Sequence, residues 1–165
     1  MFDSFTSLSS AAKKLHSQLT VISEFDFLDK SLDVRAENGE IKTAEFKLIS
    51  KNELSEKASR LFPAAPAPLS DAYIIISEGD SLTALSATKA GLYFAAGAIK
   101  RYMLTGGIPD GSIYNTPCAP FRGLKLYIPA REDIQSFYEI VELCGFFGFN
   151  TVMMEVGGAM EYKLH

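Results

Sequence analysis

Two charged residues stand where their side chains could do chemistry. Arg122 opens the apolar stretch FRGLKLYIP, and its guanidinium carries a planar fork of donors that can grip two neighbouring acceptors at once. Glu155 stands near the end of a second apolar stretch, NTVMMEV, where its carboxylate could accept hydrogen bonds or pair with Arg122. The alternatives are a strand-end arginine paired to a local carboxylate and a solvated glutamate.

The other reactive residues predict no catalytic, metal or cofactor site. Cys118 and Cys144 lie outside any Cys-x-x-Cys pattern or Cys/His cluster, so we expect two free, buried thiols. Glu161, Tyr162 and His165 follow the second stretch, but a single histidine with no fixed partner is weak evidence for a ligand or a base. We therefore expect no bound cofactor and no metal.

The elements that must position these residues can be read from hydrophobic period and turn signals. Strands are predicted over residues 20–31 and 41–49, joined through the Asn-Gly turn signal in ENGE. A helix is predicted over residues 52–62, with Asn52 as its N-cap and a proline directly after it.

The next segment predicts a hairpin and a second helix. Residues 71–87 contain an apolar strand, a turn around Gly79 and a second strand. Residues 88–105 have apolar side chains on a helical period, and two glycines stop the helix. Residues 1–119 therefore predict an α+β domain, with a mixed or antiparallel sheet and helices on one face.

The pattern changes at Phe121. A strand over residues 121–128, a helix over 131–147 and a strand over 150–156 form a β-α-β unit, whose two strands are normally parallel. One such unit cannot cover both faces of its own strands.

Two long segments resemble a known family. FRGLKLYIPAREDIQSFYEIVELCGFFGFNTVMMEV resembles the entry to the catalytic barrel of glycoside hydrolase family 20, the β-N-acetylhexosaminidases, where aromatic-Arg-Gly-Leu opens the first strand and Asn-Thr the second. DAYIIISEGDSLTALSATKAGLYFAAGAIKRYM is similar to the strand-hairpin-helix before that barrel, with its Gly-aromatic pattern at Gly91, Tyr93 and Phe94. The resemblance covers roughly residues 20–156.

The resemblance implies a fragment of a larger glycosidase. A (β/α)₈ barrel takes about 250 residues, so residues 120–165 would be the start of a truncated barrel behind a non-catalytic domain over 1–119. Arg122 would hydrogen-bond hydroxyls of a carbohydrate substrate, and Glu155 could accept hydrogen bonds from it. The family's catalytic Asp-Glu pair lies on the fourth barrel strand, so we expect this chain to be inactive.

The sequence also departs from the family's pattern. Tyr127 replaces an aspartate on the first strand, Ala130 replaces an arginine soon after it, and residues 153–158 replace the pattern His-x-His-x-x-Asp. The sugar is therefore left open. The alternatives are another barrel glycosidase, of family 84 or family 67, and a structural or interaction domain with no site. An Asp-Asp pair on the fourth strand would favour family 84.

Composition and charge limit the binding partners and the cellular location that we expect for this protein. Of 165 residues, 16 are Lys or Arg and 20 are Asp or Glu, and the basic residues are scattered, so nucleic acid is not an expected partner. The run AGLYFAAGAI is too short to span a bilayer, and the opening residues have no signal-peptide core, so we expect no membrane partner and a cytoplasmic location. Unpaired edges in a truncated barrel would lead to disorder, repacking on the first domain or a homodimer.

Overall fold

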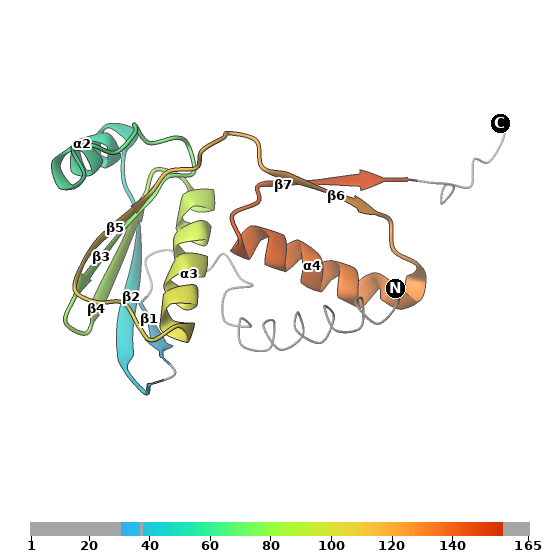
Figure 1. Cartoon of the computed structure of the whole chain (residues 1–165), viewed down its shortest axis with the longest axis horizontal. Helices are drawn as coiled ribbons and strands as arrows, with labels where there is room; N and C mark the ends of the chain where they lie inside the picture. The colour runs from blue at the N-terminus through green and yellow to red at the C-terminus, as the bar shows by residue number, and fades with distance from the viewer. Residues whose placement is uncertain (1–30, 37, 157–165) are drawn as a thin grey trace. The chain divides into compact units, whose positions relative to one another are not determined.

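The computed structural model describes residues 31–36 and 38–156, which divide into two compact units at Pro120. The first unit contains a five-stranded sheet and two helices (Figure 1). Its strands are β1 (Ser31–Arg35), β2 (Ile41–Leu48), β3 (Tyr73–Glu78), β4 (Ser81–Ser86) and β5 (Gly111–Asn115), and its helices are α2 (Lys51–Leu61) and α3 (Lys89–Leu104). Most of the strand predicted over 20–31 and the residues Glu161, Tyr162 and His165 lie outside the described residues.

The sheet is mixed, with the strand order β1-β2-β4-β3-β5. β2 and β4 run parallel, and the other three pairs are antiparallel. The hairpin predicted around Gly79 is β3–β4, and this glycine has a φ of +55°. The predicted Asn-Gly turn likewise joins β1 to β2, with Gly39 at a φ of +89°. Both glycines adopt the left-handed conformation that residues with a Cβ disfavour. The strand order and the helices together confirm the predicted mixed α+β fold.

The two helices cover opposite faces of this sheet, which corrects the expectation that they share one. Successive strand residues point to opposite faces. Phe46, Ile75 and Leu82 belong to the larger core cluster, which includes the apolar side of α3. Ile74 and Leu85 belong to a second cluster with Leu54 and Ala58 of α2. Each apolar face of β3 and β4 thus has its own helix.

Side chains outside the helices satisfy their first N–H groups. The hydroxyl of Thr88 accepts a hydrogen bond from the N–H of Gly91 at 3.0 Å and caps α3. Ser50, rather than the predicted Asn52, caps α2, because its backbone is extended and its Oγ accepts from the N–H of Glu53 at 3.1 Å. Asn52 already lies inside the first helical turn, where it cannot serve as the cap.

Gly91 brings the start of α3 close to the sheet. A Cβ at this position would lie 2.0 Å from Oγ of Ser86, which donates a hydrogen bond to the carbonyl of Ala72 at 2.7 Å. Ser86 and Ala72 are completely buried, so neither can be displaced without disturbing the core. The Gly-aromatic pattern noted in the sequence therefore has a packing reason at its glycine.

The second unit is a parallel β-α-β unit, as predicted. β6 (Gly123–Tyr127) and β7 (Thr151–Glu155) pair in parallel, and α4 (Ile134–Phe146) connects them after a 3₁₀ turn at Arg131–Asp133. Leu124 faces Val152, and Leu126 faces Met154, in the register of this pair. The same register brings Tyr127 opposite Glu155 at the carboxyl ends of both strands.

Candidate functional site

Four side chains, two charged, one aromatic and one a thioether, lie on one face of β6 and β7 toward the carboxyl ends of the strands. Lys125 and Tyr127 lie on one face of β6, and Met153 and Glu155 lie on the same face of β7, because alternate residues of paired strands share a face. The ammonium of Lys125 forms an ion pair with Oε2 of Glu155. Its Nζ also lies 5.9 Å from the ring centroid of Tyr127, at the edge of cation–π range.

Arg122 lies at the opposite end of the same strands. Its side-chain Nε donates to the carbonyl of Gly148 at 2.6 Å, and its backbone N–H donates to Oδ1 of Asn150 at 3.0 Å. Its carbonyl accepts from the N–H groups of Asn150 and Thr151 at 3.0 and 3.3 Å. Arg122, the residue before β6, is thereby hydrogen-bonded to the start of β7.

The structure does not bring Arg122 and Glu155 together. Five residue steps along β6 separate Arg122 from Tyr127, which is about 16 Å in an extended strand, and Glu155 stands opposite Tyr127. Lys125, and not Arg122, supplies the cation that pairs with Glu155. Sequence reasoning missed Lys125, although its spacing from Tyr127 places both residues on one face of the predicted strand.

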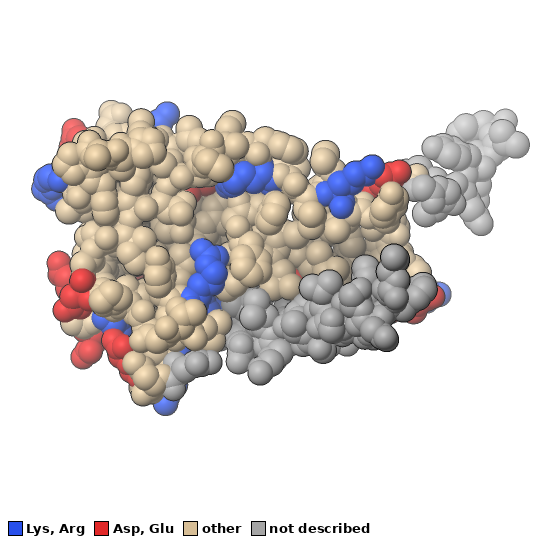
Figure 2. Space-filling model, in the orientation of Figure 1, with Lys and Arg blue, Asp and Glu red and all other residues tan. Residues whose placement is uncertain are grey.

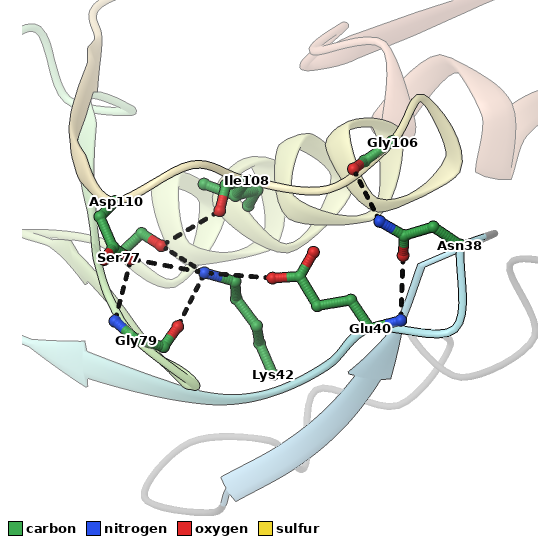
Figure 3. A network of polar contacts seen from close by, with 8 residues as sticks. All are labelled: Asn38, Glu40, Lys42, Ser77, Gly79, Gly106, Ile108 and Asp110. Carbon is green, nitrogen blue, oxygen red and sulfur yellow. Dashed lines mark hydrogen bonds and ion pairs between the residues drawn. The ribbon is translucent and has the colours of Figure 1, made fainter.

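A buried lysine forms a second polar cluster, at one end of the sheet in the first unit (Figure 3). Lys42 of β2 is only 3% exposed. Its Nζ donates to Oγ of Ser77 at 3.0 Å and to the carbonyl of Gly79 at 2.8 Å. Carboxylate oxygens of Glu40 and Asp110 lie 3.5 and 3.7 Å from the same nitrogen.

The Lys42 cluster connects loops that are distant in the sequence. Oδ1 of Asp110, just before β5, accepts from the N–H of Gly79 in the β3–β4 turn at 2.9 Å. Asn38 accepts from the N–H of Glu40 at 2.9 Å and donates to the carbonyl of Gly106, after α3, at 3.3 Å (Figure 3).

Lys42 is satisfied by the protein itself. Its three N–H groups face two hydrogen-bond acceptors and two nearby carboxylates, so each donor of the ammonium has a partner within reach. The cluster therefore holds the β1–β2 turn, the β3–β4 turn and the segment before β5 in place. The sequence contains a signal for this cluster, because Lys42 is an alternate residue of the same strand as Ala44 and Phe46 and therefore lies on the same, buried face.

The two cysteines and Lys100 point to no additional site. Both cysteines are free thiols, but Cys118 is exposed, which corrects the expectation that both are buried. Burial raises the pKa of the Cys144 thiol. Desolvation lowers the pKa of Lys100 to about 8. Within residues 31–36 and 38–156, no three His, Cys, Asp or Glu side chains are grouped so that they could hold a metal ion.

On the face that Figure 2 shows, Lys and Arg side chains are scattered among other residues and form no stripe. None of the described helices is both long and apolar enough to cross a membrane.

No protein-family model matches the sequence, and no curated protein matches it. Among the solved structures to which the chain is similar are three β-hexosaminidase-type enzymes. A mutant Streptomyces plicatus β-hexosaminidase in complex with the product GlcNAc matches with a TM-score of 0.47 and 11% identity, over 77% of this chain and 32% of the other.

The second is the family 20 exo-β-N-acetylglucosaminidase of Vibrio harveyi in complex with N-acetylglucosamine, with a TM-score of 0.45 and 15% identity, over 79% of this chain and 24% of the other. The third is the family 20 β-N-acetylhexosaminidase of Streptomyces coelicolor A3(2), with a TM-score of 0.43 and 10% identity, over 80% of this chain and 35% of the other. This chain thus spans between about a quarter and about a third of the length of each.

Proposed function

We propose that this chain is part of a glycoside hydrolase that acts on β-linked N-acetylhexosamine-type or related sugars. The observation that carries the proposal is the order of its elements. A mixed α+β unit ends with β5 at Asn115, and the parallel pair β6–β7, connected by α4, follows it. This is the order that the resemblance to family 20 implies for a non-catalytic domain and the first β-α-β unit of a barrel.

The uncovered faces and open edges of the parallel pair β6–β7 support a larger barrel around it. Parallel strands are normally covered on both faces and continue into further parallel strands. The described part of the unit leaves large apolar side chains exposed, among them Tyr127, Met153 and Met154. A (β/α)₈ barrel would pair the open strand edges and bury such side chains among its other strands.

Within this proposal Glu155 is the better placed of the two predicted substrate-binding residues. Binding and catalytic groups of (β/α)₈ enzymes lie at the carboxyl ends of the strands, and Glu155 ends β7. Arg122 precedes β6 at the other end, and its Nε donates to Gly148. Its contact with sugar hydroxyls stays a prediction of the resemblance. A homodimer formed through the open strand edges also stays a prediction.

The proposal places the catalytic groups on a later strand of the barrel. In the proposed reaction an acid carboxylate protonates the leaving oxygen, and a neighbouring aspartate orients the acetamido group whose carbonyl attacks the anomeric carbon. Both carboxylates would follow on a fourth barrel strand. This chain would supply part of the sugar-binding surface.

The proposal is tested with 4-nitrophenyl N-acetyl-β-D-glucosaminide. The 165-residue chain should release no nitrophenol above a no-protein control, whereas a longer product of the same gene should hydrolyse the substrate and lose activity when the Asp-Glu pair is replaced by Asn-Gln. Turnover by the repurified short chain would contradict the proposal, as would a longer gene that encodes no further barrel strands.

Arg122→Ala in that longer protein separates the two roles of the arginine. A sugar contact predicts a transition state weakened by about 1.5 to 3 kcal/mol in kcat/KM at unchanged stability. A purely structural role predicts a lower free energy of unfolding with kcat/KM unchanged, and that result would remove Arg122 from the substrate site.

A further inference from the structure

The turn between β1 and β2 contains an exposed asparagine that is followed by an exposed glycine, Asn38 and Gly39. Of the four asparagines in the sequence, only Asn38 precedes a glycine, whereas Asn52, Asn115 and Asn150 precede larger residues. Because glycine has no Cβ, its backbone nitrogen can approach the preceding side chain without the hindrance that other residues impose. Asn38 is therefore the asparagine whose side-chain amide the backbone can attack most easily.

The side chain of Asn38 links two segments that are distant in the sequence (Figure 3). Its Oδ1 accepts a hydrogen bond from the backbone N–H of Glu40 at 2.9 Å, within the turn. Its Nδ2 donates to the carbonyl of Gly106, after α3, at 3.3 Å. The N–H of Gly39 donates to the carbonyl of Ala36 at 3.0 Å. One side-chain amide thus holds the turn to the segment after α3.

We propose that Asn38 is a site of spontaneous modification, at which it is converted through a succinimide into aspartate and isoaspartate. The backbone nitrogen of Gly39 loses its proton to solvent and bonds to Cγ of Asn38, while Nδ2 takes up a proton and leaves as ammonia. Water then opens the ring. Cleavage between Cγ and the nitrogen gives aspartate, and cleavage between the main-chain carbonyl carbon and the nitrogen gives isoaspartate. The net reaction consumes water and releases ammonia.

The native turn slows this reaction. The nitrogen of Gly39 must lose its proton, but its N–H is held by the carbonyl of Ala36, and the leaving amide is held by Gly106. Hydrogen bonds at exposed turns open at little cost, so the reaction proceeds through brief openings of the turn. The Asp-Gly pair of the sequence, Asp110-Gly111, can form the same ring, but it reacts more slowly because an ionised carboxylate is a poorer electrophile than an amide.

The product carries a negative charge where the amide donated a hydrogen bond. An ionised carboxylate only accepts hydrogen bonds, so it cannot donate to the carbonyl of Gly106. The carboxylate of Glu40 already lies at this junction, since a Cβ at Gly107 would lie 2.7 Å from its Oε2. Like charges repel, and isoaspartate also lengthens the backbone by a methylene. The modified turn therefore separates from the segment after α3. Asn38 belongs to the first unit, and its reaction does not depend on the proposed function.

The test is a time course of the full 165-residue chain in neutral buffer, followed by digestion and mass spectrometry. The peptide with Asn38 should replace its amide NH₂ by OH at least about tenfold faster than the peptides with the other asparagines, equivalent to about 1.4 kcal/mol in the barrier. Unfolding in urea should accelerate the reaction at Asn38 about fivefold, equivalent to about 1 kcal/mol for opening the turn. If Asn38 reacts no faster than the other asparagines, the proposal is overturned, and a rate that does not rise in urea overturns the restraint by the fold.

Isoaspartate is detected with a methyltransferase that transfers a labelled methyl group from S-adenosylmethionine to isoaspartyl carboxylates. The aged chain should accept the label in the Asn38 peptide, and Asn38→Gln should abolish it, because glutamine would have to close a larger ring. Asn115→Gln is the matched control and should leave the label unchanged. Label that persists at this position in Asn38→Gln, or that arises first at Asp110, contradicts the assignment.

Asn38→Asp tests the consequence of the modification without the time course. The N–H of Gly107 donates to the carbonyl of Tyr102 at 2.9 Å, and its amide exchange should accelerate about threefold, equivalent to about 0.6 kcal/mol, when the link to the turn is lost. Asn115→Asp adds the same charge at the other end of β5 and should leave this exchange rate unchanged. Equal rates in Asn38→Asp and the unmodified chain would refute the role of the amide at the junction.

Discussion

Replacing Lys42 by methionine tests whether its cluster holds the first unit together. Methionine keeps an unbranched stem of similar length but removes the ammonium, so the hydrogen bonds to Ser77 and Gly79 at 3.0 and 2.8 Å are lost. Hydrogen bonds to a charged donor contribute about 1.5 to 3 kcal/mol each. The ammonium no longer has to be desolvated, which offsets part of that loss. Ser77 can still donate to the carbonyl of Ile108 at 3.4 Å.

We therefore expect Lys42→Met to lower the free energy of unfolding by about 2 kcal/mol. For a unit of this size that corresponds to a decrease in Tm of roughly 10 °C. Urea unfolding followed by circular dichroism measures the change, and a constant m-value shows that the same surface unfolds.

The matched control is Lys47→Met on the same strand. Lys47 pairs with Glu45 at 2.7 Å, but it is exposed, and such pairs contribute little. Its replacement should change the free energy of unfolding by less than about 0.5 kcal/mol. If Lys42→Met changes the stability no more than Lys47→Met does, the cluster does not stabilise the unit and our reasoning is wrong.

Three further predictions concern packing, pH and thiol reactivity. Gly91→Ala should cost about 2 to 3 kcal/mol, because its Cβ would lie 2.0 Å from Oγ of Ser86, and the same change in a Ser86→Ala background should cost less; equal costs in a double-mutant cycle would contradict the clash. Lys100 binds its proton less tightly in the folded chain, where its pKa is about 8, than in the unfolded chain, where it is near 10.5. The unfolded state therefore holds more protons between these pH values, and stability gained by Lys100→Met at pH 7 should shrink as the pH rises through this window; urea midpoints at both ends measure it, and a gain that does not depend on pH would refute the assignment. Iodoacetamide should modify the exposed Cys118 well before Cys144, whose pKa is raised by burial, and peptide mapping that finds equal rates in the folded chain would rule out a buried Cys144.

Local signals were sufficient for most elements. The apolar run before Gly79 and the second strand after it predict β3 and β4, because glycine permits the positive φ that a tight turn between two paired strands requires. The helical period over residues 88–105 predicts α3, and the change of pattern at Phe121 predicts the parallel β6-α4-β7 unit. Each of these signals depends only on residues that are close together in the sequence, so it can be read without knowledge of the fold.

Only the tertiary structure decided which elements meet. The parallel pairing of β2 with β4 and the placement of α2 and α3 on opposite faces depend on segments tens of residues apart. The same holds for Lys42, whose acceptor Ser77 lies 35 residues away, and for Lys125, whose partner Glu155 belongs to another strand. A hydrophobic period shows that a residue points inward, but it does not name the groups that it will meet there, because those are set by strand order and register.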